Sequence, residues 1–323
     1  MSTYLHRKIL KILMDSGVSF YNNKILLALS GGKDSLCLLK IVQDLGLIYQ
    51  WQIGIIHCNH DWRSDSIENA QMIYNLAMEL NLDFYLAKNN RQLISESNAR
   101  QWRYYNFFTV ASHDNYNIIF TAHNLNDKVE TILYNLFRGS GTNGTLSLVD
   151  SKFITSLILL QRPLLSVNLN ETFWFARYYC LPIWADITNM NLKYKRNRLR
   201  HDIIPYIKNY FNPQLNKHII QFSDKLFIQV NSYYQLSYQV YLKIIHPKYL
   251  AIHIYHYSNL HDIMQITIVK ILLKQLNISS FLDTTIKKIV IFLKNINYSN
   301  YILYLQDVVI IKKDIYIYFA QSK

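Results

Sequence analysis

The chain has 323 residues, of which 50% are hydrophobic and 17% charged, so it has enough apolar material for a packed core and is not typical of a disordered protein. No apolar run reaches the roughly 18 residues that a helix needs to cross a bilayer, which excludes a membrane-spanning protein. Lysine and arginine number 34 against 21 acidic residues, and the formal net charge of +13 fits a nucleic-acid partner or a basic enzyme without one equally well.

The three cysteines, Cys37, Cys58 and Cys180, lie far apart and form no C-x-x-C pair. We therefore expect no disulfide framework, zinc ribbon or C-x-x-C iron–sulfur site. Tyrosine is abundant at 26 residues, whereas glycine and proline number only 8 and 5, a bias produced by AT-rich codons. Together with an N-terminus unlike a transit peptide, this bias predicts a plastid-encoded chain, with a bacterial cytoplasm as the alternative.

Strand-like and helix-like segments alternate through the first half of the chain. Continuous apolar runs predict buried strands, and apolar residues at helical spacing predict helices. The strands are expected at 24–29, 52–57, 84–87 and 118–122, and the helices at 34–45, 66–80, 98–112 and 127–137. Strands joined by helices of this length favour an α/β fold with a doubly wound parallel sheet.

The pattern changes after residue 210. Helices are expected at 213–249, 261–276 and 284–293, and short strands at 301–305, 308–311 and 315–319. We therefore predict two domains, residues 1–210 and residues 211–323, of which the second is smaller and mostly helical.

A glycine-containing turn lies directly between the first strand and the first helix. Its glycines let backbone N–H groups approach a ligand, and the following helix begins with free N–H groups and a positive dipole end. An aspartate suits such a turn when Mg²⁺ lies between the carboxylate and a phosphate. The spacing fits neither the Walker A motif nor G-x-G-x-x-G. We expect phosphate binding by Ser30, Gly31, Gly32, Lys33, Asp34 and Ser35.

The hexapeptide S-G-G-K-D-S resembles the signature of the PP-loop ATP pyrophosphatase superfamily, which has an adenine nucleotide alpha hydrolase-like fold. Further segments resemble the tRNA(Ile)-lysidine synthetases in order and spacing. These are H-C-N-H-D-W-R at 57–63, N-A-R-Q-W-R-Y at 98–104, the segment 121–131 that leads to R-G-S-G at 138–141, and W-A-D-I-T-N at 184–189 followed by R-N-R-L-R-H at 196–201.

The resemblance implies an ATP-dependent carbon–nitrogen ligase that uses ATP and Mg²⁺. In the implied reaction, the C2 carbonyl oxygen of the wobble cytidine in the CAU anticodon of an isoleucine tRNA is adenylated, with release of pyrophosphate. Free lysine then attacks C2 through its ε-amine and expels AMP, so that the tRNA reads AUA as isoleucine. The second domain is expected to help bind the tRNA, and a homodimer is left open.

Ligands in a doubly wound sheet lie at the carboxyl ends of the strands. Side chains that follow strand ends are therefore expected at the ATP site, namely His57, Asn59, His60 and His123. His57 alternatively fits a core histidine that is satisfied by the protein itself. Asp34 is the candidate metal ligand.

Two pairs of charged residues are expected to act in the reaction. Asp127 and Glu130, at i and i+3 on one helix face, would bind lysine or a metal, and the sequence leaves that choice open. Arg100 and Arg103, with the same spacing, would stabilise the adenylated intermediate. The family commonly has a second histidine and another aspartate where this chain has Asn124 and Asn126.

A run of cations near residue 200 fits contact with a phosphate backbone, although a solvated surface would also explain it. The expected tRNA contacts are Lys193, Lys195, Arg196, Arg198 and Arg200. Two alternatives to a lysidine synthetase remain: a PP-loop tRNA thiolase, which needs cysteine spacing absent here, and a non-catalytic basic RNA-binding protein.

Overall fold

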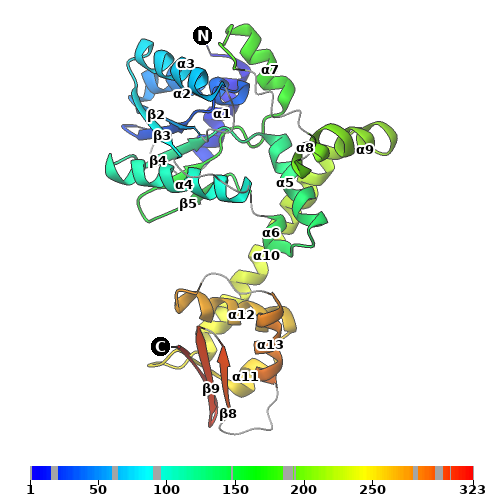
Figure 1. Ribbon diagram of the computed structural model, residues 1–323. Helices are drawn as coiled ribbons and strands as arrows, with labels where there is room; N and C mark the ends of the chain where they lie inside the picture. Colours follow the sequence, from blue (N-terminus) through cyan, green and yellow to red (C-terminus); the bar gives the residue numbers. More distant parts are fainter. Residues whose placement is uncertain are drawn as a thin grey trace. The chain divides into compact units, whose positions relative to one another are not determined.

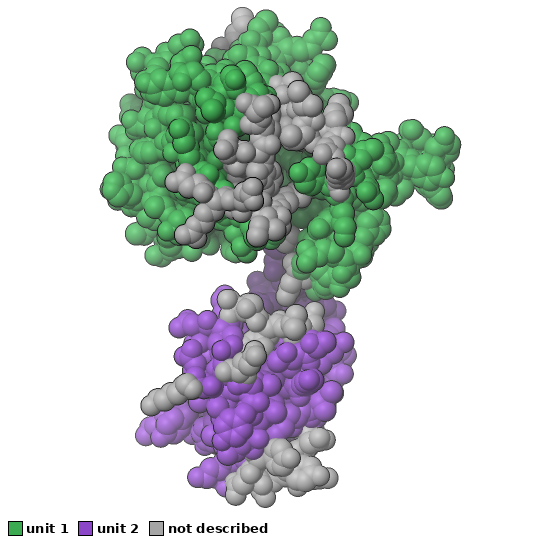
Figure 2. Space-filling model, viewed as in Figure 1, with its two compact units in different colours: residues 1–223 green, residues 224–323 purple. Residues whose placement is uncertain are grey.

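The computed structural model of the protein describes residues 2–15, 21–59, 65–89, 96–146, 148–184, 192, 194–278, 283–294, 301–305 and 307–322. Contacts divide the chain into two compact units, residues 1–223 and 224–323 (Figure 2). Each unit has a hydrophobic core of its own. The expected functional division after residue 210 stays a prediction.

Unit 1 is built on a six-stranded, mostly parallel sheet. Its strands are β1 (Lys24–Ala28), β2 (Gln52–Asn59), β3 (Asp83–Lys88), β4 (Ile118–Thr121), β5 (Ser151–Phe153) and β6 (Leu159–Gln161). They lie in the order β3-β2-β1-β4-β6-β5, and only the edge strand β5 runs antiparallel. The strand order therefore reverses between β1 and β4, where the carboxyl ends of a doubly wound sheet form a ligand crevice. The predicted fold class is confirmed.

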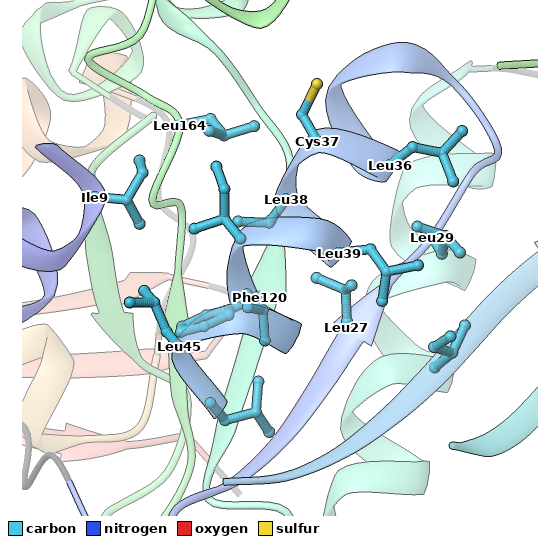
Figure 3. Close-up of a cluster of buried hydrophobic side chains, with 14 of the residues drawn as sticks. Ile9, Leu27, Leu29, Leu36, Cys37, Leu38, Leu39, Leu45, Phe120 and Leu164 are labelled. Atoms are coloured by element: carbon cyan, nitrogen blue, oxygen red, sulfur yellow. The ribbon is translucent and has the colours of Figure 1, made fainter. Parts of the chain in front are cut away.

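Helices cover both faces of this sheet (Figure 1). The helices that pack in the hydrophobic cluster on one face are α1 (Tyr4–Asp15), α2 (Lys33–Tyr49), α3 (Ser66–Glu79) and α7 (Leu169–Tyr178). The opposite face is covered by α4 (Glu96–His113). Strand β1 shows the reason, because alternate residues of a strand point to opposite faces. Ile25 and Leu27 join the cluster drawn in Figure 3, whereas Leu26 packs with Phe107 of α4.

The remaining helices of unit 1 lie beside the carboxyl ends of the strands. They are α5 (Leu125–Phe137), α6 (Thr142–Thr145), α8 (Lys195–Arg198), the π-helical turn η2 (Leu199–Ile203) and α9 (Ile204–Tyr210). Val129 and Leu133 of α5 pack with Leu199 and Ile204 in a separate small cluster. This packing holds residues 195–200 against the start of α5.

Unit 2 combines helices with a four-stranded antiparallel sheet of order β7-β10-β9-β8. Its elements are α10 (Leu215–Ile244, which begins in unit 1), β7 (Ala251–His253), α11 (Ile254–Ser258), α12 (Asp262–Gln275), α13 (Asp283–Lys294), β8 (Tyr301–Leu305), β9 (Val308–Lys313) and β10 (Tyr316–Gln321). The sequence predicted the last three strands but not the three-residue β7. None of the described helices is both long and apolar enough to cross a membrane.

Candidate active site

The predicted phosphate loop forms a tight turn between β1 and α2. Gly31 has a φ of +83°, and a Cβ built there would clash with Asn69 Oδ1. The Ser30 hydroxyl donates to Ser35 Oγ at 3.2 Å, and the Ser35 hydroxyl donates to the Gly32 carbonyl at 2.8 Å. Gly32 is the N-cap of α2 and has no side chain to cap it, so the first N–H groups of the helix are available to an anion.

Two other segments hold this loop in place. Asn69 Nδ2 of α3 donates to the Ser30 carbonyl at 3.1 Å. The backbone N–H of Trp184 donates to the Gly31 carbonyl at 3.0 Å, and the Trp184 indole N–H donates to Asp65 Oδ2 at 2.9 Å. The turn is therefore held both by α3 and by the segment that contains Trp184.

The left-handed backbone at Gly31 gives a first testable expectation. Gly31→Ala should lower the free energy of unfolding by about 1–3 kcal/mol and weaken ATP binding, because alanine is strained at this φ and its Cβ meets Asn69. Urea unfolding and equilibrium ATP binding measure the two effects. Gly32→Ala is the control, since Gly32 has a φ of −73° and its built Cβ only touches Ser30 at 3.4 Å. Equal stability of the two variants would contradict the expectation.

Three of the expected ATP-site side chains contact the protein itself. Lys33 Nζ donates to the Leu169 carbonyl of α7 at 3.2 Å and lies 3.7 Å from Asp34 Oδ1. His57 is buried with Nδ1 2.8 Å from the Leu29 carbonyl, and burial lowers its pKa. Asn59 Nδ2 donates to the Ser66 carbonyl at 3.3 Å. Their contact with ATP stays a prediction, and His60 lies outside the described residues.

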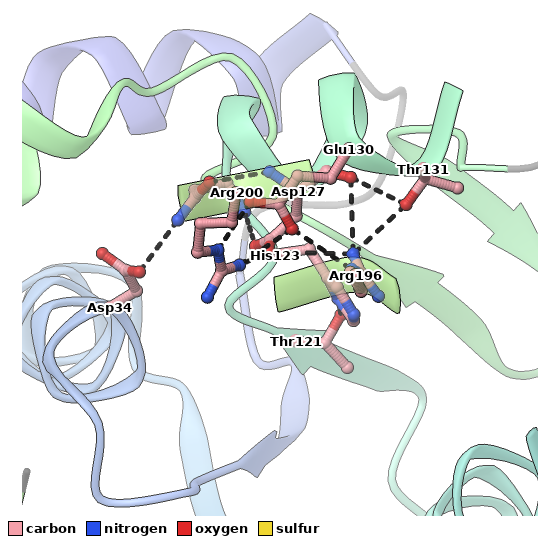
Figure 4. Close-up of polar contacts among 9 residues, drawn as sticks. Asp34, Thr121, His123, Asp127, Glu130, Thr131, Arg196 and Arg200 are labelled. Carbon is pink, nitrogen blue, oxygen red and sulfur yellow. Dashed lines mark hydrogen bonds and ion pairs between the residues drawn. The ribbon is translucent and has the colours of Figure 1, made fainter. Parts of the chain in front are cut away.

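Asn124 joins the phosphate loop to the end of β4. It caps α5, accepting at Oδ1 from the Asp127 N–H at 3.0 Å, while its own backbone N–H donates to Asp127 Oδ2 at 2.9 Å. Its Nδ2 donates to Asp34 Oδ2 at 2.8 Å (Figure 4). The two strand ends at the reversal point therefore share one hydrogen-bonded network. Sequence reasoning recorded Asn124 only as a departure from the family pattern.

His123 lies in a strongly cationic environment. Its pKa lies well below the usual range, first because of burial and then because of positive charges that include Arg162, Arg100 and Arg103. The neutral imidazole hydrogen-bonds through Nδ1 to Thr121 Oγ1 at 3.0 Å. Arg100 and Arg103 of α4 therefore lie near enough to His123 for their charges to lower its pKa, and their role with an adenylated intermediate stays a prediction.

Arg162 is a buried cation of this site that sequence reasoning missed. It directly follows β6, and its guanidinium donates to the Val149 carbonyl at 2.7 Å and to the Tyr104 hydroxyl at 3.1 Å. Its place after the short apolar run at 158–160 was the available signal, because polar residues after strand ends line the crevice.

The acidic pair of α5 is bound by two arginines (Figure 4). Arg200 Nε donates to Glu130 Oε1 at 2.6 Å and Arg200 Nη2 donates to Asp127 Oδ1 at 3.1 Å. Arg196 donates to Glu130 Oε2 at 3.2 Å and to Thr131 Oγ1 at 3.2 Å. Arg196 and Arg200, expected to contact tRNA, thus turn inward onto the carboxylates.

The other cations of this run behave differently. Lys195 and Arg198 are exposed, and Arg198 Nε donates to the Leu192 carbonyl at 2.6 Å. Lys193 lies outside the described residues. Contact of these cations with tRNA stays a prediction.

The chain is similar in sequence to a known protein family. Residues 1–207 match the model of the PP-loop domain family. A chloroplastic tRNA(Ile)-lysidine synthase from Pyropia yezoensis is 37% identical over 310 residues, which cover 94% of this chain and 93% of that protein. The chain belongs to the tRNA(Ile)-lysidine synthase family. A Nostoc member of the family is 42% identical over 224 residues, which cover 69% of this chain and 66% of that one.

A solved structure supports the fold of this lysidine synthase family member. The U34-tRNA thiolase NcsA from Methanococcus maripaludis, described with its [4Fe-4S] cluster, aligns with a TM-score of 0.56 at 15% identity. The alignment covers 69% of this chain and 77% of that chain. At this identity the likeness shows a shared fold and nothing about the reaction.

The phosphate loop of this lysidine synthase family member fits a Mg²⁺ ion that arrives with the nucleotide. Asp34 Oδ1 is shielded from solvent and has no hydrogen-bond partner among the described residues, with Lys33 Nζ 3.7 Å away. Mg²⁺ commonly binds one or two carboxylates together with substrate phosphates. Within the described part of the chain, no three His, Cys, Asp or Glu side chains gather into a ready-made metal site. Asp34 is therefore the side chain that would hold the ion.

Three histidines with lowered pKa values make the stability of this family member depend on pH. Burial lowers the pKa of His6, His57 and His123 below the ordinary value of 6.5. Below pH 6.5 the unfolded chain therefore binds protons that the folded chain does not, so stability is present above that pH and is lost as the pH falls.

We expect the free energy of unfolding, measured in urea, to decrease from pH 7 to pH 5 by up to about 1.4 kcal/mol per pH unit for each histidine. His123→Asn should flatten this slope, because it removes an imidazole whose pKa lies well below the ordinary value. A slope that is the same in the variant would contradict the assignment.

Proposed function

We propose that the crevice between β1 and β4 catalyses both steps of lysidine formation on an isoleucine tRNA with a CAU anticodon. The Ser30–Ser35 turn and the start of α2 bind the ATP phosphates through backbone N–H groups and hydroxyls. The wobble cytidine O2 attacks the α-phosphate and pyrophosphate leaves. The lysine ε-amine then attacks C2, and AMP leaves with the former O2 atom.

Mg²⁺ at Asp34 would supply charge neutralisation for the departing pyrophosphate. The cationic group around His123, to which Arg100, Arg103 and Arg162 contribute, supports stabilisation of the negatively charged phosphate of the adenylated cytidine. His123 remains neutral there and so can donate or accept a hydrogen bond without adding charge.

Asp127 is our candidate for the carboxylate that binds the lysine ε-ammonium and takes its proton. Burial raises the pKa of Asp127 against the opposing charge of Arg196, which makes this carboxylate a better base. Its side chain is 18% exposed, whereas the Glu130 side chain is 2% exposed and has arginines on both oxygens. We assign Glu130 to holding Arg196 and Arg200 in place beside Asp127.

The exposed Lys195 and Arg198 are our candidates for contact with the tRNA backbone near the modified base. Similarity to chloroplastic relatives from the algae Pyropia yezoensis and Gracilaria tenuistipitata supports a plastid location. The proposal also includes a homodimer.

The observation that carries the proposal is the hydrogen-bonded link Asp34–Asn124–Asp127, which brings the phosphate loop and the acidic pair to one point. A site that first transfers AMP and then delivers an amine needs the phosphate loop and the acidic pair beside the same reacting base. In the tRNA(Ile)-lysidine synthase family, that combination matches the two-step reaction.

Incubation of the protein with ATP, Mg²⁺, radiolabelled lysine and a transcript of the isoleucine tRNA tests the proposal. We expect one lysine in the tRNA for each pyrophosphate released, and no label in a transcript whose wobble cytidine is replaced by uridine. Pyrophosphate release without lysine transfer would indicate a different PP-loop reaction. A protein that binds the tRNA but turns over no ATP would be the non-catalytic binder.

The cysteines weigh against a thiolase reaction. Cys37 and Cys58 have free thiols, and burial raises the pKa of each to about 12, so neither is a thiolate at neutral pH. Cys180 is exposed and, like the other two, is free.

A further inference from the structure

Asn124 uses both ends of its carboxamide group, one on each side of the crevice. Its oxygen accepts the Asp127 N–H at 3.0 Å, and its nitrogen donates to Asp34 Oδ2 at 2.8 Å. The residue is only 3% exposed. With oxygen and nitrogen both engaged, the amide group has one orientation, and it connects α2 to α5 across 90 residues of sequence (Figure 4).

The contact also decides which oxygen of Asp34 is left for a ligand. Oδ2 accepts from Asn124, whereas Oδ1 is shielded from solvent, has no hydrogen-bond partner in the described residues, and has only an ion pair with Lys33 Nζ at 3.7 Å among them. A shielded carboxylate oxygen without a donor is unfavourable, and a bound cation offsets this cost. We infer that Asn124 is a positioning residue that turns Asp34 Oδ1 toward the Mg²⁺ ion of the bound nucleotide. This inference rests on the proposed function, because it takes Mg²⁺ with ATP as the ligand.

Helix capping alone does not require asparagine at this position. Serine, threonine and aspartate cap a helix as well as asparagine does, but aspartate has no donor, and the single O–H of serine or threonine is on the capping oxygen itself. The contact with the Asp34 carboxylate uses a second arm of the side chain, the amide nitrogen, which is separate from the capping oxygen. The amide group therefore serves two separate purposes, and a substitution can remove one while keeping the other.

Asn124→Ser is that substitution, because serine keeps the cap and loses the amide nitrogen that reaches Asp34. Asn168→Ser is the matched control. Asn168 caps α7 with the same geometry, accepting from the Glu171 N–H at 2.9 Å, and no described contact joins it to the phosphate loop. Both variants should have melting temperatures close to that of the unmodified chain, since the cap remains.

The measurement is Mn²⁺ binding by electron paramagnetic resonance, on the full chain with a non-hydrolysable ATP analogue and without tRNA or lysine. We expect Asn124→Ser to raise the Mn²⁺ dissociation constant about tenfold or more, as for other residues that orient a metal-binding carboxylate. Asn168→Ser should leave the constant unchanged. Nucleotide binding without metal should be the same in all three proteins.

Unchanged Mn²⁺ affinity in Asn124→Ser would overturn the inference, and so would equal weakening in both variants, which would point to the cap. The proposed function can fail separately. If Mn²⁺ binding responds to Asn124→Ser while no lysine enters the tRNA, the positioning role holds and the assigned reaction does not. If the unmodified chain binds no Mn²⁺ with the nucleotide, both are overturned.

Discussion

Asp34→Asn is expected to reduce pyrophosphate release by at least about a hundredfold at saturating ATP and tRNA. The substitution removes the charge of the carboxylate proposed to hold Mg²⁺ in the phosphate loop, and a neutral amide holds Mg²⁺ poorly. The fold should persist, because the amide oxygen can still accept from Asn124 Nδ2. Steady-state assays of pyrophosphate release, with a circular dichroism spectrum of each protein, give the comparison.

A second aspartate of the same helix provides the control for this experiment. Asp44 lies further along α2, where it contacts Lys40 at 2.7 Å and His6 at 3.0 Å. Asp44→Asn therefore removes the same charge from α2 without touching the crevice, and its pyrophosphate release should be that of the unmodified chain. Similar rates in Asp34→Asn and Asp44→Asn would remove Asp34 from the reaction.

Glu130→Gln is expected to lower the free energy of unfolding by about 3 kcal/mol, the lower end of the range for breaking a buried ion pair. Glu130 is 1% exposed, and its oxygens hold two arginines that would then face an uncharged amide. The lower end applies because the Arg196 and Arg200 side chains are 25% and 35% exposed and so retain some water. Urea unfolding at pH 7 measures the change.

Glu171→Gln is the control for Glu130→Gln, because it removes the same charge from an ion pair that is not buried. Glu171 pairs with Lys8 at 2.8 Å, and both side chains are about one-fifth exposed. Pairs of this kind contribute about 0–1 kcal/mol, so Glu171→Gln should change stability far less than Glu130→Gln. Comparable losses in the two variants would mean that the arginines do not depend on Glu130.

The central strands could be predicted because they are covered on both faces and so read as continuous apolar runs, as in residues 118–122. Strands β5, β6 and β7 have only three residues each, too few to show a pattern. Once the strands were placed, their carboxyl ends located the phosphate loop, His123 and Asp127.

The inward and outward cations near residue 200 could not be separated from the sequence. Arg196 and Arg200 reach the acidic pair because Leu199 and Ile204 pack on α5, and because a π-helical turn follows α8. Neither feature has a local signal in a run of alternating cations. The contact between Asn124 and Asp34 likewise depends on β1 and β4 being neighbours, although a cap at Asn124 could have been predicted from Asp127 three residues later.

Trp184 gives the crevice an intrinsic optical reporter. Its main chain binds the Gly31 carbonyl while its indole ring is held by Asp65, so any rearrangement of the turn on nucleotide binding reaches a fluorophore in a defined polar environment. The emission of this tryptophan should therefore follow the arrival of ATP in real time. No dye needs to be attached, and a Trp184→Phe chain supplies the blank for the other four tryptophans.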